Sequence, residues 1–193
     1  MPPSRKFQRE DILDTTYQIV KTEGIKSVNA RRIAKELNCS VQPIFHNFRD
    51  MEELKSMVYE KIYETYKEFT LSKMQTTDKP YKAIGIAYIQ FAKIYPEFFK
   101  ILFMQQTNTK SDKFVGEDVI GKAVIESGQK TFGLSYEEQK LFHVKVGIFT
   151  HGMATLVATK TVDFTEEEID KLLEDTVRQM VIGYKKEKGE KKA

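Results

Sequence analysis

The stretch NCSVQPIFHNF, residues Asn38 to Phe48, carries a mixture of side chains that could recognise another molecule. Ile44 and Phe48 are four residues apart, so on a helix they would share one face and pack into a core. The other face would carry Val41, Gln42, Pro43, Phe45, His46 and Asn47. Amide side chains can form hydrogen bonds with DNA base edges, and apolar ones can pack on thymine methyl groups. The pattern favours a DNA-reading helix over the alternative, in which Phe45 is core and the polar residues are merely solvated.

Two earlier helices are expected to support this one. Apolar residues at helical spacing predict the first helix, and Gly24 is expected to end it. The apolar stripe of that helix is Ile12, Leu13, Thr16, Ile19 and Val20. Asn29 is expected to cap a second, short helix that runs to Leu37.

A tight turn is expected between the second and third helices. Asn38 and Cys39 form this turn, since asparagine tolerates the left-handed backbone that such a turn requires. Ser40 is expected to cap the third helix, with Pro43 in its first turn, where the missing N–H costs nothing. Short helices joined in this way form a helix-turn-helix, here residues 29–48. Ser40 and the free N–H groups of the third helix could hold a phosphate group.

Positive charge is concentrated at the beginning of the chain. Residues 1–49 hold nine Lys or Arg and five Asp or Glu, whereas the whole chain has a formal net charge of +3. A local excess of this kind suits a polyanionic partner, although a solvated basic surface would show the same excess.

Residues 9–57 resemble the DNA-binding domain of TetR-type transcriptional regulators. The resemblance is carried by ILDTTYQIVKTEGIKSVNARRIAKELNCSVQPIFHNFRDMEELK. This stretch matches the family in its first helix, in the glycine before the second helix and in the pair Ile33–Ala34. It also matches in the aromatic residues Phe45 and Phe48 and in the MEEL that starts the fourth helix. The resemblance implies that residues 40–48 form the recognition helix.

The chain also departs from the family's usual pattern. The family often has glycine at the position of Asn38, a hydroxyl residue at that of Pro43 and tyrosine at that of Phe45. It often has an aromatic residue or histidine at the position of Asn47 and lysine at that of Met51. The hydroxyl residue, tyrosine and lysine commonly contact phosphates in that family. We therefore expect Arg49, Lys6 and Arg5 to supply part of the charge that holds the DNA backbone.

The remainder of the sequence predicts helices throughout, because no clean alternation of apolar and polar residues indicates a strand. Asp50 is expected to cap the fourth helix. Capping boxes at Ser135 with Glu138 and Thr165 with Glu168 predict the last two helices, at about 136–160 and 166–186. The expected fold is all-α with about nine helices, divided into a DNA-binding domain (1–50) and a regulatory and dimerisation domain (51–193).

The stretch LFHVKVGIFTHGMATLVAT is apolar almost all round, which indicates a helix covered on both sides. One side would face its own core and the other a second subunit, although a central helix of a monomer would give the same pattern. One reading helix contacts few base pairs, so a homodimer on a palindromic operator is also expected from function. The candidate interface residues are Val144, Ile148, Gly152, Leu173, Val177 and Met180.

Aromatic residues are abundant in the second domain, and the resemblance implies a small-molecule pocket among them. The candidate pocket residues are Phe91, Tyr95, Phe99, Phe103, Phe149 and His151. His151 could instead lie at the dimer interface. Aromatic stripes at helical spacing are also typical of an ordinary core.

Several functions are not expected from the composition. The single Cys39 excludes an internal disulfide, and with three scattered histidines it predicts no metal site and no cofactor. No nucleophile or carboxylate pair has the spacing of a catalytic site, so no catalytic residues are assigned. No apolar run approaches the roughly 20 residues that span a bilayer, and no secretion signal follows the start. We expect a cytoplasmic protein with no membrane partner.

Together these patterns predict a homodimeric transcriptional repressor that a small apolar or amphipathic ligand releases from double-stranded DNA. One alternative is a ligand-independent DNA-binding dimer, whose second domain only dimerises or docks a protein partner. Another is an enzyme or carrier that shares only the helical fold.

Overall fold

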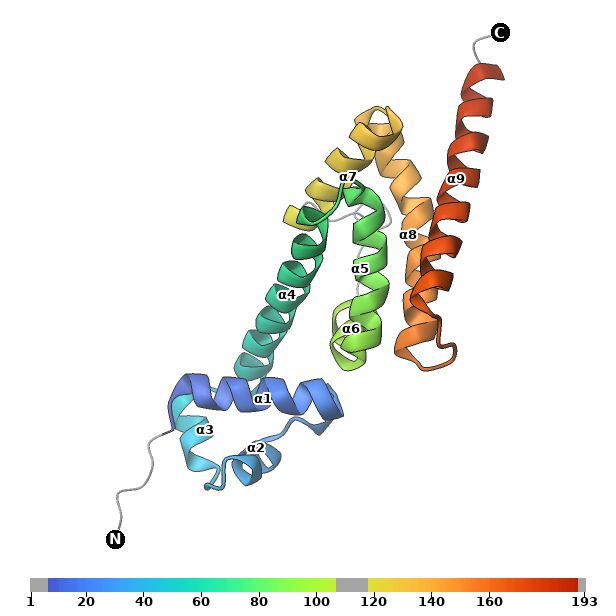
Figure 1. The fold of residues 1–193 in the computed structure, drawn as a ribbon. Helices are drawn as coiled ribbons and strands as arrows, with labels where there is room; N and C mark the ends of the chain where they lie inside the picture. The colour runs from blue at the N-terminus through green and yellow to red at the C-terminus, as the bar shows by residue number, and fades with distance from the viewer. Residues whose placement is uncertain (1–6, 107–117, 191–193) are drawn as a thin grey trace. The chain divides into compact units, whose positions relative to one another are not determined.

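The computed structural model describes residues 7–106 and 118–190 of the 193-residue chain. Over these residues it has nine α-helices, one short 3-10 helix and no strand, which confirms the all-α prediction (Figure 1). The helices are α1 (Arg9–Glu23), η1 (Ile25–Ser27), α2 (Ala30–Glu36), α3 (Gln42–Asn47), α4 (Met51–Gln75), α5 (Pro80–Ile94), α6 (Pro96–Phe103), α7 (Val119–Phe132), α8 (Tyr136–Ala158) and α9 (Glu166–Glu190).

The chain forms two compact units. Of the described residues, the first contains 7–66 and 95–105, and the second contains 67–94, 106 and 118–190. The division differs from the expected boundary at residue 50, because the first part of α4 (51–66) belongs to the first unit and α6 packs against α1 in that unit. A sequence pattern cannot show that a helix so far along the chain returns to the first core.

Local signals set the boundaries of the first helices as expected. Gly24 ends α1 with φ of +80°, and Asn38 adopts the left-handed conformation with φ of +51°. The Asn29 side chain accepts a hydrogen bond from the backbone N–H of Arg32 (3.0 Å), and the Asp50 side chain accepts one from Glu53 N–H (2.8 Å).

The expected cap of α3 at Ser40 is wrong. The helix begins at Gln42, Val41 occupies the capping position, and no side chain caps it. The backbone already has helical angles at Val41 (φ −72°, ψ −14°), so Ser40 lies one residue before the capping position. Pro43 lies in the first turn, as predicted.

The second unit is built around α8, which packs against α5, α7 and α9. Figure 1 shows α9 running alongside α8. Both predicted capping boxes are present: Ser135 N–H donates to Glu138 (2.8 Å) and Thr165 N–H donates to Glu168 (2.8 Å). In the described part of the chain, α8 alone is long and apolar enough, by length and composition, to cross a membrane, a test that core helices also pass.

Candidate nucleic-acid interface

The two faces of α3 differ in burial as the sequence predicted. Ile44 and Phe48 are fully buried in the first unit. Phe45 is 50% exposed and Val41 39% exposed, and Gln42 and His46 are also exposed. An exposed aromatic ring next to an exposed amide and an imidazole is a surface that can contact base edges and methyl groups.

Asn47 holds α3 in place and is not freely exposed. Its side-chain amide donates to the carbonyl oxygens of Pro43 (2.8 Å) and Phe7 (3.3 Å). The residue is only partly exposed. Both N–H groups are therefore engaged within the protein, so the amide donor that was expected to read a base is already occupied.

Arg9 contacts both the C-terminal end of α3 and α4. Its guanidinium lies 4.3 Å from the centre of the Phe48 ring and donates to the carbonyl oxygen of Asn47 and to the carboxylate of Glu53 (2.5 Å). Glu53 also accepts a hydrogen bond from the N–H of Arg49 (2.7 Å). The hydrogen bond from Arg9, followed by that from Arg49, lowers the pKa of Glu53.

An Arg9→Ala variant should lower the free energy of unfolding by about 1–2 kcal/mol, since it removes a cation–π contact and a partly exposed ion pair together. Urea denaturation followed by circular dichroism measures the change. Arg31→Ala is the matched control, because Arg31 is exposed and makes no ion pair within the described residues. Equal stability of Arg9→Ala and the wild-type protein would contradict this role.

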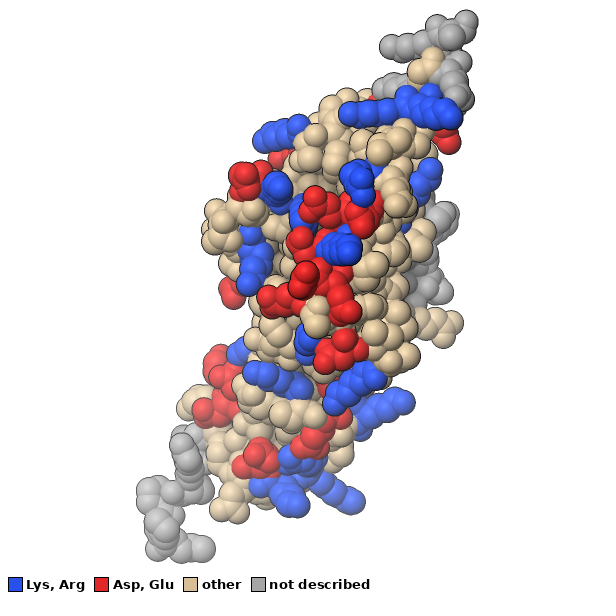
Figure 2. All heavy atoms as spheres, turned by 45° about the vertical axis from the view of Figure 1, so that its right-hand side comes forward, with Lys and Arg blue, Asp and Glu red and all other residues tan. Residues whose placement is uncertain are grey.

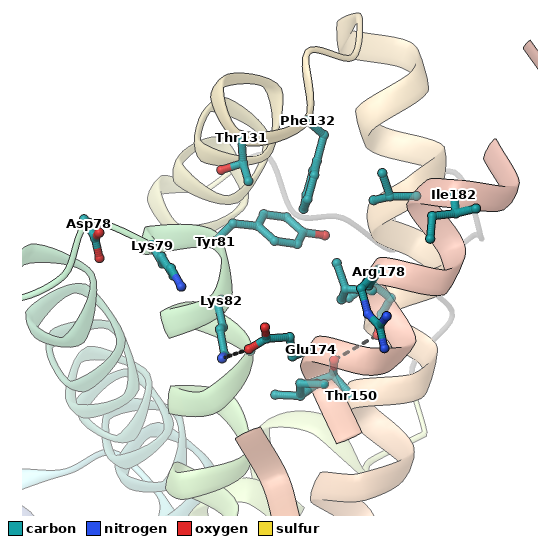
Figure 3. A pocket seen from close by; sticks show the side chains of 15 residues that line it. Asp78, Lys79, Tyr81, Lys82, Thr131, Phe132, Thr150, Glu174, Arg178 and Ile182 are labelled. Carbon is teal, nitrogen blue, oxygen red and sulfur yellow. Dashed lines mark hydrogen bonds and ion pairs between the residues drawn. The ribbon is translucent and has the colours of Figure 1, made fainter. Parts of the chain in front are cut away.

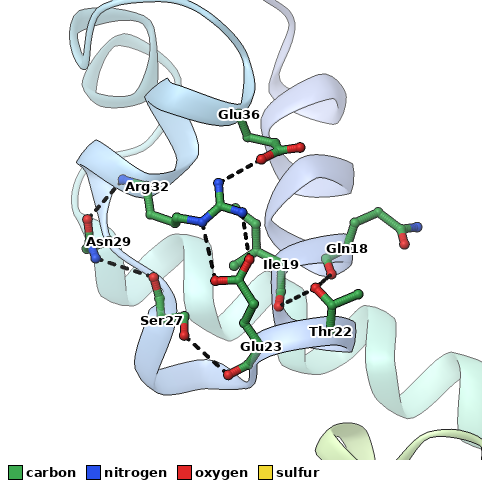
Figure 4. A network of polar contacts seen from close by, with 8 residues as sticks. All are labelled: Gln18, Ile19, Thr22, Glu23, Ser27, Asn29, Arg32 and Glu36. Carbon is green, nitrogen blue, oxygen red and sulfur yellow. Dashed lines mark hydrogen bonds and ion pairs between the residues drawn. The ribbon is translucent and has the colours of Figure 1, made fainter.

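A second network fastens α2 to the end of α1 (Figure 4). Arg32 pairs with Glu23 (2.6 Å) and with Glu36 (2.7 Å). The hydrogen bond from Arg32 lowers the pKa of Glu23. Arg32 is thus used within the protein, whereas Arg31 and Lys35 on α2 are exposed and have no ion pair in residues 7–106 or 118–190.

Basic side chains therefore remain available around α2 and α3. In Figure 2, Lys and Arg side chains are spread over the face shown, and several lie among Asp and Glu side chains at the lower end of the view, the end at which Figure 1 draws α2 and α3. Arg31 and Lys35 were not among the DNA-contacting residues predicted above, although their outward positions on the helix and the local excess of positive charge indicated them. Lys6 lies outside the described residues.

Arg49 has an 81% exposed side chain, and it pairs with Asp50 (3.0 Å). The sequence predicts that Arg49 contacts a phosphate of bound DNA. On that prediction, Arg49→Ala should weaken DNA binding equally for all sequences and reduce the slope of log affinity against log salt by about one. Fluorescence anisotropy with a selected and an unrelated duplex at several salt concentrations tests this. An unchanged slope would remove Arg49 from the phosphate contacts.

The surface beside α3 is hollow. A concavity of about 900 Å³ is lined by Phe7, Gln8, Leu37, Asn38, Cys39, Ser40, Gln42, Pro43, His46 and Asn47. Gln42, Ser40 and His46, all predicted to contact DNA, thus face a shared recess next to the helix-turn-helix turn.

The expected pocket residues do not all belong to one unit. Phe91 and Phe99 are fully buried core residues, and Tyr95 stacks on Phe98 (5.6 Å between ring centres). Contacts divide the six residues between the two units, with Tyr95, Phe99 and Phe103 in the first and Phe91, Phe149 and His151 in the second. His151 shares a hydrogen bond with the Tyr88 hydroxyl (2.9 Å).

The expected interface residues separate into exposed and buried groups. Ile148 is 62% exposed and Gly152 is exposed, whereas Val144 and Met180 are partly buried. The prediction of Leu173 as an interface residue is wrong, because its side chain is 4% exposed and faces Gly85 of α5 within its own unit. Helix α9 has apolar residues on two sides, so periodicity alone could not show which side the core covers. The exposed apolar residues also include three that were not among the candidates, Leu141 and Leu156 on α8 and Leu172 on α9.

A polar pair in the second unit joins the buried Tyr81 to the half-buried His143. The Tyr81 hydroxyl shares a hydrogen bond with His143 Nδ1 (3.0 Å), and the Tyr81 ring contacts Phe132 edge to face. Burial lowers the pKa of His143 to about 4 and raises the pKa of Tyr81, so both groups are neutral near pH 7.

Lowering the pH should destabilise the protein through His143. Its pKa is about 4 when folded and near 6.5 when unfolded, so the unfolded chain binds the proton more tightly between these values. The contribution to stability is complete above pH 6.5 and is lost as the pH falls toward 4, by roughly 2 kcal/mol between about pH 7.5 and pH 5. Urea denaturation at both pH values measures the loss. His143→Gln should show a correspondingly smaller change, and an equal change would exclude His143 as the cause.

The described residues contain no group of three or more His, Cys, Asp or Glu side chains placed to bind a metal ion.

Comparisons with known proteins identify the fold only. No family model matches the sequence, and no curated protein sequence matches it. The chain is similar to the solved structure of a protein of unknown function from Rhodococcus sp. RHA1, with a TM-score of 0.67 and 16% sequence identity. The likeness covers 95% of this chain and 98% of that one. At this identity the likeness shows that the two chains share a fold, and it carries no function from one to the other.

Proposed function

We propose that this chain is a TetR-type transcriptional regulator that binds double-stranded DNA in the cytoplasm and reads it with α3. The observation that carries the proposal is the exposure of Gln42, Phe45 and His46 on a helix whose opposite side, Ile44 and Phe48, is core. Burying such a ring inside the protein would be favourable, so its exposure beside hydrogen-bonding groups favours an external partner. Arg31, Lys35 and Arg49 provide nearby exposed charge for the phosphates.

The regulator is proposed to act as a homodimer. Leu141, Ile148 and Leu156 expose apolar side chains on α8, and Gly152 between them has open space where a side chain would lie. Two copies joined along such a face could place two reading helices in successive major grooves, about 34–36 Å apart. The exposed face is the reason for proposing a second copy of the same chain as the partner.

In the proposed mechanism the protein is a repressor, and a small apolar or amphipathic molecule releases it from its operator. The ligand needs only to bind the conformation with low DNA affinity better than the one with high affinity. A ligand-independent DNA-binding dimer is the second candidate. It is favoured by one observation: Phe91 and Phe99, expected at a pocket, are fully buried.

Selection of DNA fragments by the purified protein, followed by sequencing, tests the proposal. We expect enrichment of a two-fold symmetric site whose half-sites are centred about one helical turn apart, or a multiple of it. Binding without any enriched sequence, or no binding at low salt, would contradict the proposed function.

A further inference from the structure

A cavity of about 390 Å³ lies within the second unit, between α5, α7, α8 and α9 (Figure 3). Its size is within the range of small-molecule sites in proteins. Its walls are mainly apolar, formed by Tyr81, Gly85, Phe132, Val146, Leu173, Val177, Val181 and Ile182. None of the six aromatic and histidine residues expected at a pocket lines this cavity.

We infer that this cavity binds a small, uncharged and largely apolar molecule that carries one hydrogen-bonding group. The binding itself rests on the cavity alone. Its role as the effector site of a regulator rests on the proposed function.

Gly85 helps to keep the cavity open. A side-chain carbon at this position would lie 3.6 Å from Leu173 Cδ1 on the facing helix. Both residues line the cavity, so a larger side chain at position 85 would extend into the space that a ligand would occupy.

Three charged side chains at the edge of the cavity, Lys82, Glu174 and Arg178, are in ion pairs. Lys82 pairs with Asp170 (2.8 Å) and Glu174 (2.5 Å), and Arg178 pairs with Asp175 (2.6 Å). Asp78 and Lys79, which also line the edge, are neighbours of opposite sign. A charged ligand would lose its hydration and would have to compete with these pairs, so an uncharged one is favoured.

Tyr81 provides a neutral polar group at the wall. Its hydroxyl is bound to His143 Nδ1, and contact with the Phe132 ring holds its orientation. Burial lowers the pKa of His143 to about 4, so the pair carries no charge near pH 7. A hydroxyl shares its hydrogen with one partner and still has lone pairs for another, so Tyr81 can bind a ligand's hydroxyl or amide group but cannot form an ion pair with it.

The test is a fluorescence titration of the full chain with N-phenyl-naphthylamine, an uncharged apolar fluorophore. We expect saturable binding, with decanol displacing the fluorophore at roughly tenfold lower concentration than decanoate. Gly85→Phe fills the cavity from α5 and Thr131→Trp obstructs it from α7, and each should weaken binding about tenfold or more. Lys130→Trp, an exposed neighbour on α7 outside the lining, should bind like the wild type.

The inference would be overturned if Thr131→Trp and a Gly85→Phe variant of normal helix content both bind the fluorophore as the wild type does. If Gly85→Phe unfolds, the result for Thr131→Trp decides alone. Stronger displacement by decanoate would overturn the assigned ligand class. Loss of fluorophore binding as protein concentration rises would show instead that a second copy covers the cavity.

A separate measurement distinguishes this inference from the proposed function. A gel shift with a selected duplex, with and without decanol, shows whether occupancy changes DNA affinity. If fluorophore binding behaves as expected but the protein does not bind DNA, the proposed function fails and the binding site stands. If DNA is bound but decanol does not alter the affinity, the role of the cavity as the effector site is overturned.

Discussion

An Ile148→Glu variant is expected to be monomeric and to bind a selected operator at least about a hundredfold more weakly than the wild type, because the two half-sites would no longer be bound together. Ile148 is the most exposed of the large apolar side chains on α8. A carboxylate placed in an apolar contact between two subunits would lose its hydration without gaining a partner, at a cost of several kcal/mol. The same substitution should have little effect on the folded subunit, since the side chain is in solvent there.

Sedimentation equilibrium gives the oligomeric state, and a gel shift gives the affinity. Val119→Glu is the matched control: Val119 is also a well-exposed apolar residue, but it lies in the first turn of α7, where an acidic residue is favourable. A dimeric Ile148→Glu protein would show that the α8 face is not the interface. A monomeric wild-type protein with full operator affinity would contradict dimeric binding as a whole.

A Gln42→Ala/Phe45→Ala double variant is expected to lose most of its ability to distinguish its selected site from unrelated DNA. A good hydrogen-bonded contact between a side chain and a base contributes about 1–3 kcal/mol of discrimination, which corresponds to roughly 5-fold to 150-fold. Removal of the exposed Phe45 ring should add to the loss if it packs on thymine methyl groups. Neither substitution removes a charge, so the salt dependence should be unchanged.

Competition binding with selected and unrelated duplexes measures the ratio of affinities for the double variant. Tyr59→Ala provides the control, because Tyr59 is an exposed aromatic residue on α4, outside the reading helix. A ratio that remains at the wild-type value would show that α3 does not read the DNA sequence. A uniform loss of affinity with an altered salt slope would indicate instead that these residues contact only the backbone.

The helices themselves were largely predictable because their limits depend on neighbouring residues. Gly24 ends α1, Asn29 caps α2, and the boxes at Ser135 and Thr165 begin the last two helices, all through contacts within a few residues. Ser40 was the exception. Its hydroxyl could have capped α3, but the backbone had already turned into helical geometry by Val41.

The division of α3 into a buried and an exposed face was also predictable, since Ile44 and Phe48 are one helical turn apart. The hydrogen bonds of the Asn47 side chain were not predictable. Its amide is occupied by the carbonyl oxygens of Pro43 and Phe7, and the second of these lies far away in the sequence. Such long-range hydrogen bonds leave no trace in local periodicity.

In the second unit, local pattern established that α8 and α9 are apolar and long, whereas packing established which of their sides remain free. Leu173 and Ile148 look alike in the sequence, yet Leu173 faces Gly85 while Ile148 faces solvent. Likewise Phe91 became core, and a cavity lies where α5, α7, α8 and α9 leave space beside Gly85. Helix formation and capping follow from interactions between residues a few positions apart, so the order of residues was sufficient to predict them. Burial, cavities and free surfaces depend on which helices approach one another, and only the packed chain contains that information.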